Sequence, residues 1–234
     1  MNVCIIGNSQ AACLKAAWDV PENRPPGQAV TFFAAFGMSL RNLALQGGRL
    51  VPTKDTLRRN LFYTAGVGEI DLAAFDVFLV CGVGLGLRPL DARLSSQAVR
   101  ALCADIMRSS LAYSIVKKIR DGSHRPIYLM HSPLLDERRA RDREVLAYRD
   151  YVGWLEEALD VPGAHLLRQP EETITRAHYT RIEFSQDAAR LALNQKTEGV
   201  QHKENDYNHM NARYGAVRLK DFFERVAAPP PARR

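Results

Sequence analysis

Three residues in two short motifs have side chains that could together perform nucleophilic catalysis. Ser9 lies in Gly7-Asn8-Ser9, directly after an apolar run, whereas Asp206 and His209 lie in Asp206-Tyr207-Asn208-His209, near the other end of the chain. A serine hydroxyl is a weak nucleophile at neutral pH. It becomes effective when an imidazole takes its proton and a carboxylate holds that imidazole in the right tautomer. These residue types therefore predict a Ser–His–Asp triad that attacks an ester carbonyl, on the condition that the fold unites residues 9 and 209.

Each motif also has an ordinary local explanation. Serine and asparagine are common at helix N-caps and glycine is common in turns, so Gly7-Asn8-Ser9 alone is weak evidence. Asp206 could likewise cap a final helix that has His209 in its first turn. The joint placement of the motifs favours the catalytic interpretation, because one follows the first predicted strand and the other precedes the last predicted helix.

Short apolar runs alternate with helical patterns along most of the chain. The predicted strands are residues 3–6, 29–33, 75–81, 126–130 and 165–167. The predicted helices are residues 11–18, 40–45, 95–119, 145–159, 187–194 and 209–226, and residues 195–205 are predicted to form a polar loop. This alternation predicts an α/β fold, with a parallel sheet covered by helices on both faces. Such sheets bind ligands at the carboxyl ends of their strands, where Ser9, Gly37 and Gly84 would lie.

The composition is that of a folded protein with one substantial core. The chain has 234 residues, of which 46% are hydrophobic, so residues 1–228 are predicted to form a single domain and residues 229–234 a disordered tail. The first residues show neither a secretory signal nor a membrane-spanning segment, and a cytoplasmic location is expected. The four cysteines lie in apolar stretches without metal-type spacing, which indicates reduced core thiols.

The charge balance raises the question of an anionic partner. The formal net charge is +6, and residues 108–149 hold ten Lys and Arg residues against five Asp and Glu residues. Acidic residues are interleaved among the basic ones and no aromatic stacking pattern accompanies them, so a solvated helix face is favoured over nucleic-acid binding. An acidic polysaccharide or a glycolipid is a candidate substrate that this charge balance does not exclude.

The two motifs and the layout of nearly the whole chain resemble the SGNH hydrolase family, also called GDSL-like esterases and lipases. Members carry Gly-Asp-Ser after the first strand and Asp-x-x-His before the last helix, and residues 210–215 also look like the family's run after its histidine. The resemblance implies a three-layer α/β/α, flavodoxin-like fold with a parallel sheet of about five strands. It implies Ser9 as nucleophile, His209 as general base and acid, and Asp206 as the orienting carboxylate. Asn8 stands where the family usually has an aspartate.

The family's oxyanion hole matches this chain less well. The resemblance implies three donors: the Ser9 N–H, a glycine N–H after the second strand, and an asparagine side chain in a Gly-x-Asn motif. Gly37 fits the second donor, with Gly47 and Gly66 as alternatives. The third motif corresponds to Gly82-Val83-Gly84, so the asparagine is absent.

The loss of one such donor typically costs about 3 kcal/mol of transition-state stabilisation. The Gly84 N–H is a candidate replacement, and a plain tight turn explains these glycines equally well. Gly37, Gly84 and Asn8 are therefore the candidate oxyanion and substrate-binding residues.

Two motifs could suggest a cofactor or a metal, but their spacing or context does not support either. Gly82-x-Gly84-x-Gly86 is not a dinucleotide fingerprint, because its third glycine is misplaced by one and it follows a later strand. His202, Asp206 and His209, spaced by four and three residues, could bind a metal from one helical face, but residues 201–205 are predicted to be a loop. No cofactor or metal is therefore expected.

The predicted reaction is hydrolysis of a carboxylic ester through an acyl-enzyme. The resemblance suggests a small acyl group, such as an acetyl ester on a carbohydrate. An acyltransferase would use the same residues and differ in excluding water from the acyl-enzyme. A carbohydrate-binding or scaffold protein without turnover is the competing class, since the oxyanion asparagine is missing.

Overall fold

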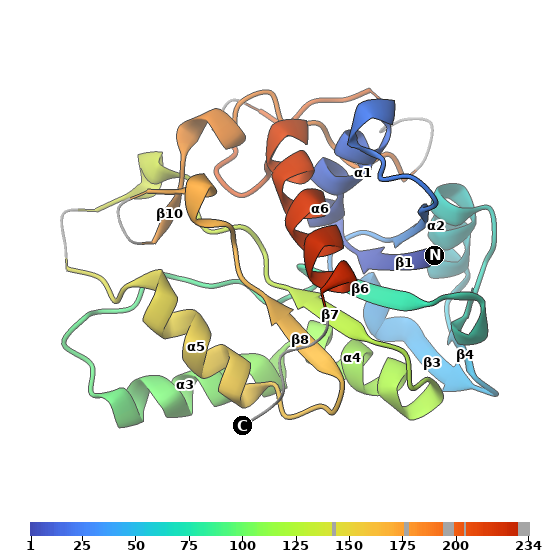
Figure 1. Cartoon of the computed structure of the whole chain (residues 1–234), viewed down its shortest axis with the longest axis horizontal. Helices are drawn as coiled ribbons and strands as arrows, with labels where there is room; N and C mark the ends of the chain where they lie inside the picture. The colour runs from blue at the N-terminus through green and yellow to red at the C-terminus, as the bar shows by residue number, and fades with distance from the viewer. Residues whose placement is uncertain (142–143, 176–177, 194–198, 204, 229–234) are drawn as a thin grey trace.

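The computed structural model of the protein describes residues 1–141, 144–175, 178–193, 199–203 and 205–228. A five-stranded parallel sheet forms its centre (Figure 1). Its strands are β1 (Asn2–Gly7), β2 (Ala29–Ala34), β6 (Val77–Cys81), β7 (Ile127–Met130) and β8 (Ala164–Leu167). They are arranged in the order β2-β1-β6-β7-β8. Counted within this sheet alone, the order is 2-1-3-4-5, which is the flavodoxin-like arrangement. The predicted fold class is thereby confirmed.

Helices cover both faces of this sheet because alternate strand residues point to opposite sides. In β1, Cys4 and Ile6 pack into one buried cluster and Val3 and Ile5 into another. Figure 1 shows α1 and α6 side by side on one face and α3, α4 and α5 on the other. The helices are α1 (Ala12–Trp18), α2 (Asp55–Ala65), α3 (Ser96–Ser109), α4 (Leu111–Gly122), α5 (Tyr148–Ala158) and α6 (Ala212–Ala227).

The structure divides the predicted helix over residues 95–119 into α3 and α4. Ser110 has an extended backbone (φ −72°, ψ 143°), and its hydroxyl accepts a hydrogen bond from the Tyr113 N–H at 3.1 Å. The same hydroxyl donates to the Met107 carbonyl at 2.7 Å. Serine thus caps both helix ends at once, and apolar periodicity does not reveal this break because it continues across Ser110.

The predicted helix over residues 40–45 is wrong. These residues form a 3-10 turn and then β3 (Leu43–Gln46), which pairs antiparallel with β4 (Arg49–Pro52), and β4 pairs with β5 (Ile70–Asp71). Gly47 and Gly48 form the β3–β4 turn with φ of +56° and +77°, as expected of a two-residue hairpin loop. Gly47 therefore has a structural role, as has Gly66, which ends α2 in the left-handed conformation.

Two boundaries near the C-terminal motif also differ from the prediction. Residues 187–193 are not helical; an antiparallel bridge joins Ala189 to Gln201, and Asn194 lies outside the described residues. The last helix begins at Ala212 instead of His209, because the Asn211 side chain caps it by accepting from the Tyr214 N–H at 3.2 Å. His209 is consequently a loop residue.

The remaining regular elements are short. A two-stranded sheet joins β9 (Ile174–Thr175) and β10 (Tyr179–Thr180), and 3-10 turns cover Ser9–Ala11, Pro21–Asn23, Ser39–Asn42, Leu72–Ala74, Glu137–Arg139, Glu171–Thr173 and Ile182–Phe184. The four cysteines are free and buried, as predicted. Within the described ranges, no helix has both the length and the apolar composition needed to cross a bilayer. The predicted tail, residues 229–234, lies outside the described residues.

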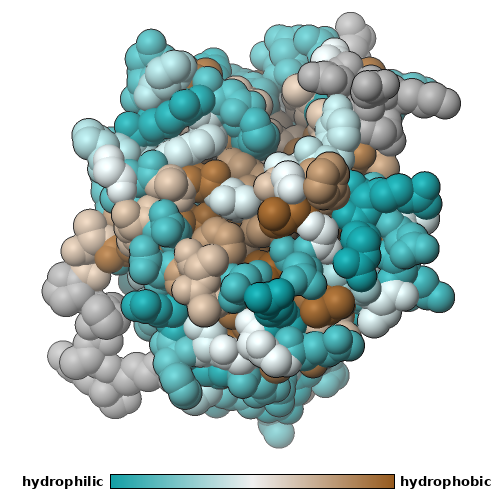
Figure 2. Space-filling model, turned by 90° about the vertical axis from the view of Figure 1, so that its right-hand side faces the viewer, coloured by the Kyte–Doolittle hydropathy of each residue, from teal (hydrophilic) through white to brown (hydrophobic). Residues whose placement is uncertain are grey.

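The surface carries some apolar groups among hydrophilic ones. Figure 2 shows one face on which apolar side chains gather in the middle and hydrophilic side chains surround them. On the described part of the chain, two of the exposed large hydrophobic residues are Phe36 and Met38, which flank Gly37 in the loop after β2. Apolar side chains therefore border the loop that carries one candidate oxyanion donor.

Candidate active site

Ser9 lies at the carboxyl edge of β1, at the start of the turn that leads into α1. Asn8 begins this turn, since its side-chain oxygen accepts from the Gln10 N–H at 3.0 Å and its carbonyl from the Ala11 N–H at 2.9 Å. A Cβ on Gly7 would lie 2.7 Å from the Ala11 Cβ, which is too close for any side chain. Gly7 therefore permits the sharp turn, and Asn8 holds it in shape.

Asp206 folds its own segment into a compact turn. One carboxylate oxygen, Oδ1, accepts from the Asn208 N–H at 2.9 Å and from the His209 N–H at 3.1 Å. The segment is also tied to the loop after β7, where the Asp136 N–H donates to the Tyr207 carbonyl at 3.1 Å. These bonds orient the His209 side chain before α6 begins.

The structure brings the three predicted triad residues into a continuous hydrogen-bonded chain. His209 Nε2 lies 2.9 Å from Ser9 Oγ, and His209 Nδ1 lies 2.8 Å from Asp206 Oδ2. Ser9 and His209 are 200 residues apart in sequence. This is the arrangement in which an imidazole can take the serine proton while a carboxylate fixes its tautomer.

A close contact between α1 and α6 holds the two halves of the site together. Gly215 of α6 lies directly against the backbone of Cys13 in α1: a Cβ on Gly215 would be 1.9 Å from the Cys13 carbonyl oxygen and 3.0 Å from the Ala17 Cβ. Only glycine permits the helices to approach this closely. Because α1 follows Ser9 and α6 follows His209, the distance between the helices sets the distance between Ser9 and His209.

The surroundings of Asp206 keep its carboxylate ionised. Burial raises the pKa of Asp206, but hydrogen bonds from the Asn208 N–H and from His209, together with the positive charge that His209 and His202 can carry, outweigh burial and lower this pKa below its ordinary value. A carboxylate that stays charged can stabilise a positive charge on a neighbouring imidazole.

A second histidine binds the same carboxylate. His202 Nδ1 lies 2.9 Å from Asp206 Oδ2, and the rings of His202 and His209 stack with centroids 3.8 Å apart and planes 10° apart. The sequence pattern indicated His202 only as a metal ligand. The antiparallel bridge between Ala189 and Gln201, which places His202, cannot be recognised from the spacing of residues along the chain.

The donor atoms of His202, Asp206 and His209 all lie within 4.8 Å of one another, close enough for a metal ion. The hydrogen bonds count against this use. Both Nδ1 atoms lie within 2.9 Å of one carboxylate oxygen, Asp206 Oδ2, which occupies the position toward which both are directed. Both Nδ1 atoms are instead placed to donate to the carboxylate.

The candidate oxyanion donors come from three loops. Gly82, Val83 and Gly84 all have positive φ, of +73°, +38° and +78°. Val83 is fully buried, and for a β-branched residue this conformation is strained, as is common near functional sites. A Cβ on Gly84 would lie 3.3 Å from Met38 Sδ, so the loop after β6 touches the loop that carries Gly37.

Among the described residues, the backbone N–H groups of Ser9, Gly37 and Gly84 have no hydrogen-bond partner. Each of these N–H groups therefore has an open position for an acceptor. Gly84 stands where the asparagine was expected after β6, so that position offers no side-chain amide. The Asn8 side-chain oxygen, in contrast, is occupied by the Gln10 N–H, which gives Asn8 a defined role in the turn.

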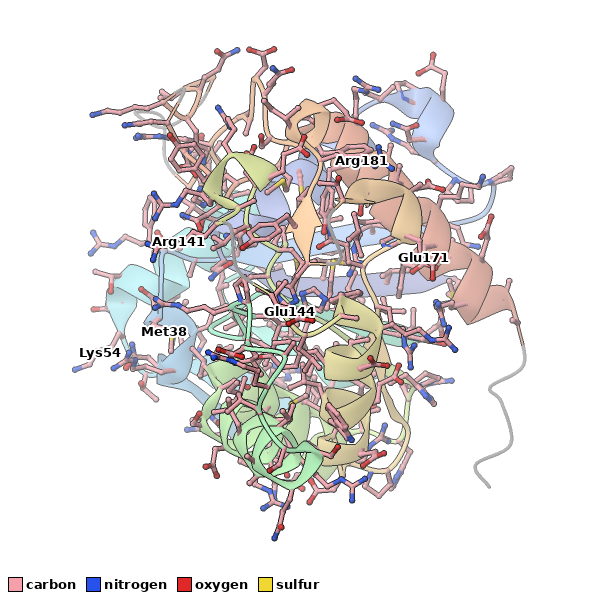
Figure 3. All side chains as sticks on the ribbon, turned by 90° about the vertical axis from the view of Figure 1, so that its left-hand side faces the viewer. Met38, Lys54, Arg141, Glu144, Glu171 and Arg181 are labelled. Atoms are coloured by element: carbon pink, nitrogen blue, oxygen red, sulfur yellow. The ribbon has the colours of Figure 1, made fainter. Side chains whose placement is uncertain are left out.

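Two arginines border the site through Tyr207. Arg138 and Arg139 lie over the Tyr207 ring, with guanidinium carbons 4.8 Å and 5.4 Å from its centroid. Arg138 also binds the buried Asp136 carboxylate at 2.9 Å. Figure 3 shows Met38, Arg141 and Glu144 on one face of the molecule, so apolar, basic and acidic side chains share it.

The rest of the basic segment is dispersed. Lys118 donates to the Leu43 carbonyl at 2.6 Å, and Arg108 pairs with Asp160 at 3.6 Å. These contacts lie on α4 and at the end of α3, away from the Tyr207 contacts. The positive excess of residues 108–149 thus does not form one continuous surface.

Comparison with protein-family models gives no match, and comparison with curated proteins gives none either. Among solved structures, the chain is similar to the periplasmic domain of a lipopolysaccharide acetyltransferase from Salmonella ser. Paratyphi A. The identity is 12% and the TM-score 0.49, over 97% of this chain and 84% of that one. It is also similar to a lipase/acylhydrolase from Enterococcus faecalis, at 12% identity and a TM-score of 0.43 over 100% of both chains. Because both TM-scores lie below 0.5, neither similarity bears on the function.

Proposed function

We propose that this protein is a serine-dependent enzyme that cleaves a carboxylic ester through an acyl-enzyme, as the resemblance to SGNH hydrolases implies. The observation that carries the proposal is the chain of two hydrogen bonds from Ser9 Oγ through His209 to Asp206, at 2.9 Å and 2.8 Å. These bonds join side chains from distant parts of the sequence in the order that a nucleophile, its base and an orienting carboxylate require.

In the first half of the reaction, Ser9 Oγ forms a bond to the ester carbonyl carbon as its proton passes to His209 Nε2. The resulting imidazolium is stabilised by Asp206 through Nδ1–H. His209 then gives the proton to the departing alkoxide, and the ester C–O bond breaks to leave an acyl group on Ser9. In the second half, His209 takes a proton from water, the hydroxide oxygen bonds to the acyl carbon, and the proton returns to Ser9 as the acid leaves.

Backbone donors would stabilise the tetrahedral intermediates. The N–H groups of Ser9, Gly37 and Gly84 come from loops after neighbouring strands, and they lack other partners in the described chain. Two of these donors would lower the activation barrier by several kcal/mol even if the third bound the oxyanion more weakly, since each donor is worth about 3 kcal/mol. We therefore propose a working oxyanion hole without an asparagine.

The substrate to assay first is a small acyl ester, such as an O-acetyl group on a carbohydrate, as the resemblance suggests. Transfer of the acyl group to a hydroxyl acceptor would use the same three residues, with an acceptor alcohol in place of water. The two reactions can be separated by adding a carbohydrate acceptor and measuring how the acyl group partitions between free acid and new ester.

Hydrolysis of p-nitrophenyl acetate tests the proposal. Ser9→Ala and His209→Ala should each lower kcat/KM by at least about a thousandfold, as loss of a triad member does elsewhere. Ser96→Ala and His124→Ala, at exposed positions away from the site, are the matched controls and should retain full activity.

A fluorophosphonate probe with mass mapping gives an independent readout, and we expect a single adduct at Ser9. Equal hydrolysis rates in all five proteins, with no adduct at Ser9, would contradict the esterase proposal. The binding or scaffold interpretation would then be favoured.

A further inference from the structure

Asp206 is shared by two histidines, of which the proposed reaction uses only one. Its Oδ2 atom lies 2.8 Å from His209 Nδ1 and 2.9 Å from His202 Nδ1, while Oδ1 accepts the two backbone N–H bonds of its own turn. A carboxylate offers about four acceptor positions. All four are therefore filled, and within the described part of the chain His202 supplies the one bond that comes from outside the turn.

The backbone of His202 is fixed by pairing with a neighbouring segment. The His202 N–H donates to the Ala188 carbonyl and the Arg190 N–H to the Val200 carbonyl, both at 2.8 Å. Leu191 and Leu193, which follow Arg190 in the sequence, are buried in a small cluster with Ala12 and Ala34. Ala12 is the first residue of α1, so the segment that pairs with His202 packs against the helix that follows Ser9.

The stacked ring of His202 also limits the movement of His209. Rings 3.8 Å apart and nearly parallel leave no space for water on that face of His209. Rotation of the His209 ring about its own side chain would push it into His202. Its Nε2 atom is thereby kept aligned with Ser9 Oγ.

His202 itself does not contact the reacting atoms. The described contact to Ser9 Oγ comes from His209 Nε2, whereas the His202 Nε2 atom is buried and has no partner within the described ranges. Burial and the neighbouring His209 charge lower the pKa of His202, so it is neutral at pH 7 and donates through Nδ1–H. Its contribution must therefore pass through Asp206 and His209.

We propose that His202 is a positioning residue of this site, which holds the Asp206–His209 pair in line with Ser9 through its hydrogen bond to Asp206 and its stack on His209. This inference rests on the proposed function. Without His202, the Asp206 carboxylate loses the only bond that a described residue outside its own turn makes to it, and the His209 ring gains freedom on one face. The cost falls on the chemical step rather than on substrate binding.

Two substitutions separate the hydrogen bond from the ring. His202→Asn keeps a donor N–H close to the position of Nδ1, whereas His202→Phe keeps an aromatic ring and removes the donor. For p-nitrophenyl acetate we expect His202→Phe to lower kcat by about 10- to 100-fold, the range seen when outer partners of a functional histidine are lost. We expect KM to change less than twofold and His202→Asn, which keeps the donor but loses the stacked ring, to recover part of kcat. Unchanged kcat in both variants would overturn the inference.

Proton NMR gives a readout that needs no turnover. In Ser9→Ala, which cannot react, two low-field N–H resonances are expected, one for each histidine bound to Asp206. His202→Phe in this background should remove one of them. The absence of a second low-field resonance from Ser9→Ala would overturn the inference even if the His202 variants fail to fold.

The two readouts also distinguish the inference from the proposed function. Two resonances without hydrolysis by the native protein would mean that the proposed function fails while the shared carboxylate stands. Hydrolysis that depends on Ser9 and His209 but not on His202 would mean that the positioning role alone fails.

Discussion

Gly215→Ala tests whether the contact between α1 and α6 sets the geometry of the triad. The added Cβ would lie 1.9 Å from the Cys13 carbonyl oxygen, whereas an ordinary contact begins at 3.4 Å, a shortfall of about 1.5 Å. The obstacle is backbone, which cannot move aside as a flexible side chain can. The two helices must therefore separate near this point, or α6 must shift along its axis.

The size of the effect follows from this displacement. Overpacking of a core typically costs 1 to 3 kcal/mol of unfolding free energy, and we expect about 2 to 3 kcal/mol here because the clash is severe. The Ser9–His209 hydrogen bond, at 2.9 Å, has little tolerance for a shift of about 1 Å. A misplacement of that size costs about 100-fold in rate, so kcat for p-nitrophenyl acetate should fall by at least that factor.

Gly153→Ala is the matched control for this experiment. Gly153 lies in α5, and a Cβ there would meet no atom within 4 Å. Alanine stabilises a helix interior relative to glycine by 0.5 to 1 kcal/mol, so this variant should unfold at slightly higher urea and retain full activity. If Gly215→Ala showed native activity and an unchanged urea midpoint, the argument that the helix contact fixes the distance between Ser9 and His209 would be refuted.

Two further predictions concern protons and metals. Burial lowers the pKa of His131 to about 3, and its neutral form is built into a network in which Nε2 accepts from Tyr148 and Nδ1 donates to the Ser132 carbonyl. In the unfolded chain His131 binds a proton near pH 6.5, whereas in the folded chain it does not. The contribution of His131 to the free energy of unfolding is therefore present above pH 6.5 and is lost as the pH falls. Urea unfolding should show a decrease of about 2 to 3 kcal/mol between pH 6.5 and pH 4.5, and His131→Phe should show a smaller decrease over the same range; an identical decrease in both proteins would contradict the assignment. Dialysis against a chelator should leave ester hydrolysis unchanged, because the Nδ1 atoms of His202 and His209 already bind the Asp206 carboxylate; lost activity restored by Zn²⁺ would instead establish a metal site.

Much of the fold was readable from local patterns. Each of the five strands of the central sheet was predicted from an apolar run, because parallel strands buried on both faces must be apolar along their whole length. Ser9, His209 and Asp206 were also selected as a candidate triad from their types and motifs, and the structure brings them into hydrogen-bond contact, while their catalytic role stays a prediction. Cytoplasmic location, a single domain and a carbohydrate ester as substrate stay predictions.

The wrong secondary-structure predictions came from features that the apolar periodicity of the sequence does not report. Ser110 interrupts a continuous apolar pattern by capping two helices, and the Gly47-Gly48 turn converts an apolar run into an antiparallel hairpin. Ala189 pairs with Gln201, inside the predicted polar loop, and this long-range pairing overrides the helical pattern of residues 187–193. A local propensity of a few tenths of a kcal/mol per residue is too small to resist such contacts.

The sequence by itself determined which side chains were available for chemistry and that a parallel sheet would present Ser9 at its carboxyl edge. Only the tertiary structure decided that His209 meets Ser9 and that His202 joins Asp206. The physical reason is that these distances depend on packing between segments far apart in the chain, above all on the glycine contact of α6 with α1. No spacing of residues encodes such a contact, because it arises only when both helices have docked on the same sheet.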